Sequence, residues 1–189
     1  MGIVTLLLLA VGLSMDAFAV SITNGLCIKD ISKRQTLQVG LAFGLAQGIM
    51  PILGYLAGQT FSKAISSLDH WIALILLGAI GGKMILEAVK EMKEPESCPV
   101  GGILTTKMLI LQAIATSIDA LAVGVSFAVM NVNIWVASSF IACTTFLFGV
   151  AGVIIGKKSG FFLKSKAELA GGAILVLIGV KIFIEHTLS

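Results

Sequence analysis

Long apolar stretches that carry almost no charge are the feature that most constrains the fold of this chain. Residues 2–28, 35–62 and 108–156 contain no Lys, Arg or Glu. Roughly 20 apolar residues in a helix span a bilayer core about 30 Å thick. Only 12% of the 189 residues are charged, whereas a soluble domain carries about 25%. The predicted fold class is therefore an all-α integral membrane protein.

Six spans account for most of the chain. We expect transmembrane helices near residues 2–24, 37–59, 70–90, 105–130, 133–156 and 168–186. These helices leave no room for a soluble catalytic domain, and we expect neither enzyme activity nor a cofactor. The segment Ala17–Ala19 resembles a signal-cleavage site, but no basic residue precedes the apolar run and Asp16 interrupts it. The first span should therefore be retained.

Three motifs recur in the same order in the two halves of the chain. The segment SMDAFAV at 14–20 resembles SIDALAV at 117–123, the glycines at 54 and 58 correspond to those at 152 and 156, and residues 81–87 correspond to 179–185. This pattern predicts two three-helix repeats, 1–92 and 105–189, joined by a cytoplasmic linker, 93–104. Because each repeat has an odd number of helices, the second should enter the membrane from the opposite side, which is the inverted topology common in secondary transporters.

Basic residues gather in the loops after the first, third and fifth predicted spans. The loops on the other side contain only Lys63. By the positive-inside rule the basic loops are cytoplasmic and both termini are extracytoplasmic. The net charge of +3 is spread over short loops, so no patch favours nucleic acid. The basic-loop residues are Lys29, Lys33, Arg34, Lys90, Lys93, Lys107, Lys157, Lys158, Lys164 and Lys166.

Two aspartates lie deep in predicted spans, at equivalent positions of the two repeats. Asp16 lies in the first span and Asp119 in the fourth. An acidic side chain at the centre of a membrane helix costs roughly 2.5–3.5 kcal/mol, so it normally faces the bundle interior or a watery cavity. Two facing carboxylates repel unless one is protonated or a cation lies between them. We expect a divalent cation there; the alternative is two neutral acids hydrogen-bonded between helices.

Hydroxyl groups at helical spacing surround these aspartates. Oxygen donors favour Mg²⁺, Ca²⁺ or Mn²⁺ over soft metals. The three cysteines, Cys27, Cys98 and Cys143, show neither metal-ligand spacing nor an obvious disulfide framework. The expected partners are thus a divalent ion as substrate and membrane lipid. The candidate metal ligands are Asp16, Asp119, Ser14, Thr116 and Ser117.

Other polar residues in the spans leave two interpretations open. Lys83 with Glu87, and Lys181 with Glu185, are i,i+4 pairs that form salt bridges or extend toward the interface. Alternatively, one member of a pair contacts an intramembrane aspartate. Gln47 either lines a polar path or makes a hydrogen bond between helices.

The two aspartate motifs resemble the paired signatures of the MntP-type manganese efflux pumps. These are small six-helix proteins of the bacterial inner membrane, related to the lysine-exporter superfamily. The resemblance covers essentially the whole chain, including residues 43–51 and 81–83. It implies export of Mn²⁺ from the cytoplasm, with Asp16 and Asp119 as the transport carboxylates; Ser14, Thr116 and Ser117 match the motif.

Alternative functions belong to other classes. An exporter of an amino acid or another small solute would fit the superfamily, although two acids suit a cation better than a zwitterion. A non-transporting membrane scaffold would contact its partners through the helix faces that carry glycines. An intramembrane aspartyl protease is weakly supported, because neither Tyr-Asp nor Gly-x-Gly-Asp occurs. No nucleotide-binding motif occurs, which favours an ion gradient over ATP as the energy source.

Overall fold

A computed structural model describes residues 3–28, 30–65, 69–93, 98, 103–130, 132–158 and 162–187. Within these ranges it places the backbone alone at 61–65, 69–73, 91, 93, 129, 162–164 and 185–187. The six helices are α1 (Ile3–Cys27), α2 (Lys33–Ile65), α3 (Asp69–Lys93), α4 (Thr106–Val129), α5 (Ile134–Gly156) and α6 (Phe162–Thr187).

Within the described part of the chain, five helices are long and apolar enough to cross a membrane. They are α1 and the segments Lys33–Thr60, Thr106–Ala128, Ile134–Gly156 and Ser165–Ile184. This confirms the all-α class and its several membrane spans. Helices α2 and α6 begin earlier than the predicted spans, because backbone hydrogen bonding continues through polar residues that the bilayer core would exclude.

Side-chain caps fix where three of the helices begin. Ser32 and Gln35 form a reciprocal capping box before α2: the Ser32 amide donates to Gln35 Oε1 at 2.9 Å, and the Gln35 amide donates to Ser32 Oγ at 3.2 Å. Thr105 accepts from the Met108 amide at the start of α4, and Asn133 accepts from the Val136 amide at the start of α5. These caps satisfy backbone donors that the first helical turn leaves unpaired.

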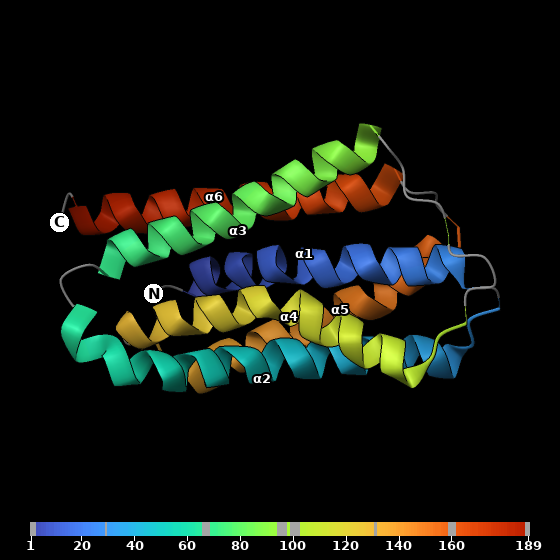
Figure 1. Cartoon of the computed structure of the whole chain (residues 1–189), viewed down its shortest axis with the longest axis horizontal. Coiled ribbons are helices and arrows are strands. Elements are labelled where there is room, and N and C mark those ends of the chain that lie inside the picture. The colour runs from blue at the N-terminus through green and yellow to red at the C-terminus, as the bar shows by residue number, and fades with distance from the viewer. Residues whose placement is uncertain are drawn as a thin grey trace.

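The helices run roughly antiparallel along one long axis (Figure 1). Helices α1, α3 and α5 run in one direction and α2, α4 and α6 in the other, so both chain ends lie at one end of the bundle (Figure 1). Helix α1 packs against α5 and α6, α2 packs against α4 and α5, and α3 packs chiefly against α6. Large apolar side chains such as Leu45 and Leu86 point outward, at 60% and 73% exposure. That surface suits lipid contact.

Glycines set the closest helix approaches. Gly54 and Gly58 of α2 lie against the backbone of Leu121 and Val125 in α4. Gly152 and Gly156 of α5 lie against Phe18 and Ile22 in α1. An added Cβ would overlap the facing carbonyl at each of these positions, so only glycine allows such proximity. The two sets of contacts link corresponding residues of the two sequence repeats.

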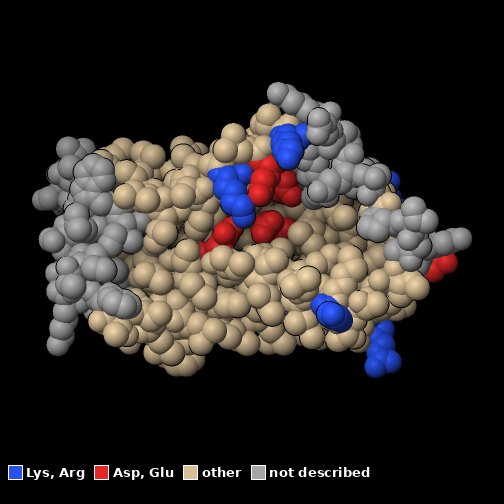
Figure 2. All heavy atoms as spheres, viewed as in Figure 1, with Lys and Arg blue, Asp and Glu red and all other residues tan. Residues whose placement is uncertain are grey.

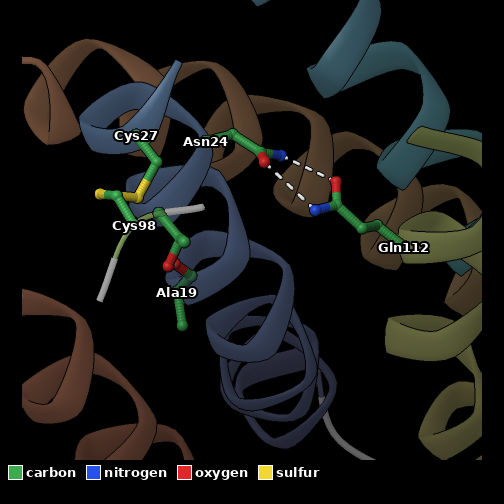
Figure 3. The surroundings of a disulfide bond; sticks show 6 residues. Ala19, Asn24, Cys27, Cys98 and Gln112 are labelled. Carbon is green, nitrogen blue, oxygen red and sulfur yellow. Dashed lines mark hydrogen bonds between the residues drawn. A yellow bond between two sulfur atoms is a disulfide. The ribbon is translucent and has the colours of Figure 1, made fainter. Parts of the chain in front are cut away.

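A disulfide joins Cys27, at the end of α1, to Cys98, in the segment between α3 and α4 (Figure 3). Their Cα atoms lie 5.2 Å apart although they are 71 residues apart in sequence. The expectation of no disulfide framework was therefore wrong, because the path of the chain from α3 to α4 decides this proximity. Cys143 is a free, exposed cysteine on α5 rather than a packing residue.

Candidate cation site

Asp16 and Asp119 occupy the middle of α1 and α4, and both are half-buried. Since α1 and α4 run in opposite directions, the two acids lie on antiparallel helices near the centre of their spans (Figure 1). Small residues follow each acid on the buried side: Ala17 and Ala120 are both fully buried. The helices can therefore pack closely beside the carboxyl groups.

Gln47 of α2 connects the two aspartate helices and is fully buried. Its Nε2 donates to the Thr116 carbonyl at 2.9 Å and to the Leu13 carbonyl at 3.4 Å. Leu13 and Thr116 each precede an aspartate by three residues, which is about one helical turn. The structure thus confirms the interhelical hydrogen bond that was one of the two interpretations of Gln47, and it places this amide beside both motifs.

The three hydroxyl residues named as candidate ligands lie in the interior. Ser14 and Ser117 are fully buried and Thr116 is 4% exposed. Each hydroxyl donates to the carbonyl three residues earlier in its own helix, at 2.8 Å for Ser14, 2.9 Å for Ser117 and 3.2 Å for Thr116. A hydroxyl that donates in this way keeps lone pairs that can accept a hydrogen bond or bind a cation.

Among the side chains that the structure describes, three other buried oxygens have no hydrogen-bond partner: Gln47 Oε1, Thr145 Oγ1 and Ser138 Oγ. Sequence analysis did not single out Thr145, which is fully buried in α5. The sequence repeat could have indicated Thr145, because it follows Gln47 by 98 residues, the same offset that relates Gly54 to Gly152. Glu168 of α6, only 8% exposed, is a second residue that the sequence did not single out.

Charged side chains gather in a hollow on one face of the bundle that is otherwise largely uncharged (Figure 2). Lys83 and Glu87 of α3 are exposed and lie 3.9 Å apart, which confirms their i,i+4 ion pair. Both also act electrostatically on Asp119 of α4. An exposed pair of this kind contributes little to stability, but it adds one positive and one negative charge to the electrostatic surroundings of Asp119.

The corresponding lysine of the second repeat has a different partner. Lys181 Nζ lies 3.1 Å from the Thr5 hydroxyl oxygen and donates to it, which joins α6 to α1. The side chain of Glu185 lies outside the described residues. The second ion pair therefore stays a prediction.

A reciprocal amide pair joins α1 and α4 near the disulfide (Figure 3). Asn24 Nδ2 donates to Gln112 Oε1 at 2.9 Å, and Gln112 Nε2 donates to Asn24 Oδ1 at 3.2 Å. The corresponding positions of the other repeat are the buried apolar residues Phe127 and Leu9. One end of the α1–α4 pair is therefore joined by hydrogen bonds and the other is packed by apolar side chains.

Within the described residues, no group of three or more His, Cys, Asp or Glu side chains could hold a metal. Among these described residues, a bound cation would therefore need hydroxyl, amide or backbone oxygens beside its carboxylates. Carboxylate and carbonyl oxygens are the donors that suit Mg²⁺, Ca²⁺ and Mn²⁺.

The fold and its polar interior define a small polytopic membrane protein with oxygen donors between its helices. The sequence profile of the MntP family, described as "Putative manganese efflux pump", matches residues 30–183. The chain belongs to this family.

Curated relatives match along almost the whole chain. "Putative manganese efflux pump MntP 2" of Clostridium botulinum strain Hall is 51% identical over 194 residues, covering 99% of this chain and 96% of the relative. The proteins named "Putative manganese efflux pump MntP" are 49% identical in Ruminiclostridium cellulolyticum, covering 98% and 97%, and 44% identical in Clostridium perfringens strain SM101, covering 99% and 96%. No solved structure matches the chain.

Proposed function

We propose that this protein is a secondary transporter that exports Mn²⁺ from the bacterial cytoplasm. The proposal is supported by membership of the family, together with an aspartate in the middle of both α1 and α4 and buried hydroxyls on the same two helices. Manganese is the transported substrate, and other divalent cations that prefer oxygen ligands could enter the same site.

The proposed cation site uses Asp16 and Asp119 as its charged ligands. A divalent cation would offset the repulsion between two ionised carboxylates in a poorly hydrated interior. Ser14, Thr116 and Ser117 would contribute neutral oxygens from the same two helices. Their burial and the Gln47 bridge between α1 and α4 support this arrangement.

The proposed architecture is two inverted repeats, residues 1–92 and 105–189, joined by the 93–104 linker, with α3 as the sixth span. Corresponding helices run in opposite directions (Figure 1). The glycine contacts also correspond. Gly54 of the first repeat lies against Leu121 of the second, and the corresponding Gly152 of the second repeat lies against Phe18 of the first. Such repeats give transporters two similar halves that can open alternately to each side.

The proposed orientation places the basic loops in the cytoplasm. Ten of the 13 basic residues lie in these loops, and the positive-inside rule assigns them to the cytoplasm. The Cys27–Cys98 disulfide lies at this same end, although disulfides persist mainly in oxidising compartments. A cytoplasmic location is compatible with these two cysteines, because the cytoplasm keeps such thiols reduced. The charge distribution therefore sets the proposed orientation.

Manganese tolerance tests the function directly. We expect the chain to restore growth in a bacterium without manganese export under graded Mn²⁺, and to lower cell manganese several-fold by elemental analysis. Parallel cultures in Zn²⁺, Cd²⁺ and lysine should show no rescue. Growth equal to the empty vector in Mn²⁺, or rescue in lysine instead, would contradict the proposal.

Cysteine labelling tests the orientation. Thr60 and Lys158 are exposed and lie near opposite ends of the bundle. In a chain whose native cysteines are replaced by serine, a membrane-impermeant maleimide should label Thr60→Cys in intact cells. It should label Lys158→Cys only after permeabilisation. The reverse pattern would overturn the charge assignment and would place the disulfide outside.

A further inference from the structure

We infer that Gln47 and Thr145 are neutral cation ligands that bind through Gln47 Oε1 and Thr145 Oγ1. This inference rests on the proposed function and adds two helices, α2 and α5, to a site otherwise built from α1 and α4. The inference is based on two fully buried side-chain oxygens that have no hydrogen-bond partner. They lie at corresponding positions of the two sequence repeats.

The orientation of the Gln47 amide follows from its partners. Both groups that it contacts, the carbonyls of Leu13 and Thr116, can only accept hydrogen bonds. The nitrogen must therefore face them, and Oε1 is necessarily the atom left over. A buried acceptor without a donor costs about 1–3 kcal/mol, so a cation or an ordered water would be favoured at this oxygen.

Pro51 affects a second oxygen of Gln47, its main-chain carbonyl. Proline lies inside α2 four residues after Gln47 and has no amide hydrogen. The main-chain carbonyl of Gln47 therefore lacks its usual helical donor. In transporters, carbonyls released from the helical ladder are a recurrent source of ligands for ions.

Thr145 lies in the part of α5 that packs against residues 40–48 of α2, the stretch that includes Gln47. Gly44, one turn before Gln47, lies against Ala142 and Phe146, which flank Thr145 in sequence. A Cβ added at Gly149, one turn after Thr145, would lie 3.1 Å from Gly40 Cα of α2 and 3.7 Å from Ser21 Oγ of α1. The face of α5 that carries Thr145 thus points toward α1 and α2.

Thr145, like Ser138 of the same helix, differs from the buried hydroxyls of α1 and α4 in its hydrogen bonding. Ser14, Ser21, Thr116 and Ser117 each donate to a carbonyl of their own helix. The Thr145 hydroxyl makes no such bond although it is fully buried. Beside Asp16 and Asp119, a cation such as Mn²⁺ needs further oxygens, which Gln47 and Thr145 would supply.

Manganese binding to the purified full chain in detergent tests the inference, with free Mn²⁺ measured by its paramagnetic resonance signal. Gln47→Met keeps a long side chain but removes the whole amide, both Oε1 and the Nε2 that donates to the Leu13 and Thr116 carbonyls. We expect affinity for Mn²⁺ to fall roughly 10-fold or more. The new thioether should also raise preference for Cd²⁺ relative to Mn²⁺, because sulfur suits softer metals. The matched control is Gln38→Met, an exposed position of the same helix, which should bind as the native chain does.

Thr145→Val separates a ligand role from a packing role. Removing a buried hydroxyl without a partner should leave the melting temperature unchanged or raise it, while affinity for Mn²⁺ falls. The neighbouring Thr144→Val is the control and should keep native affinity. Native affinity in both Gln47→Met and Thr145→Val would overturn this inference alone. Failure of the native chain to bind or export Mn²⁺ would overturn the proposed function and this inference with it.

Discussion

Asp16→Asn and Asp119→Asn are each expected to lower the rate of Mn²⁺ transport by roughly 100- to 1000-fold. Two unit charges 4 Å apart attract by about 4 kcal/mol at an effective dielectric constant of 20, which corresponds to about three orders of magnitude in affinity. Asparagine keeps the size of the side chain and removes the charge. The measurement is Mn²⁺ uptake into inside-out membrane vesicles, normalised to the amount of folded protein.

Asp30→Asn is the matched control for these variants. Asp30 lies exposed between α1 and α2 with a φ of 57°, a left-handed conformation that asparagine also adopts readily. Its transport rate should equal that of the native chain. If Asp16→Asn or Asp119→Asn transports Mn²⁺ at the native rate, that carboxylate is not a ligand, and hydrogen bonding between neutral acids becomes the better account of the pair.

Gly54→Ala is expected to cause the largest loss of stability among single-methyl additions. The new Cβ would overlap the Leu121 carbonyl of α4, and a backbone atom cannot move aside as a side chain can. Overpacking typically costs 1–3 kcal/mol, so the apparent melting temperature in detergent should fall by several degrees. Gly152→Ala should behave alike, since its Cβ would lie 2.8 Å from the Phe18 carbonyl of α1.

Gly82→Ala provides the contrast. Outside the neighbouring turns of α3, no heavy atom of the described residues lies within 4 Å of a Cβ added at Gly82, and alanine favours a helix by about 1 kcal/mol over glycine. This variant should be as stable as the native chain or more so. If Gly54→Ala melts at the same temperature as Gly82→Ala, close packing of α2 on α4 is not what limits stability.

Family membership and the helical membrane fold could be read from local sequence. Apolar stretches such as residues 108–156 exceed what any soluble helix needs, and helix formation in lipid requires only that each segment satisfy its own backbone. The boundaries were less accurate: α6 begins at Phe162 rather than near residue 168, because polar turns extend a helix beyond its apolar core.

Part of the site could also be predicted. An acid is so unfavourable in an apolar span that Asp16 and Asp119 were distinctive by composition alone. The sequence also predicted the Lys83–Glu87 ion pair, since residues four apart meet on one face of a helix.

Only the tertiary structure could decide which residues from distant segments meet. The Cys27–Cys98 disulfide, the Asn24–Gln112 amide pair and the Gln47 bridge join residues between 34 and 88 positions apart. Periodicity assigns each residue to a face of its own helix but does not say which other helix covers that face. The sequence by itself therefore determined the class of protein and the positions of two aspartates in its spans, while helix packing decided which buried polar groups from distant segments meet.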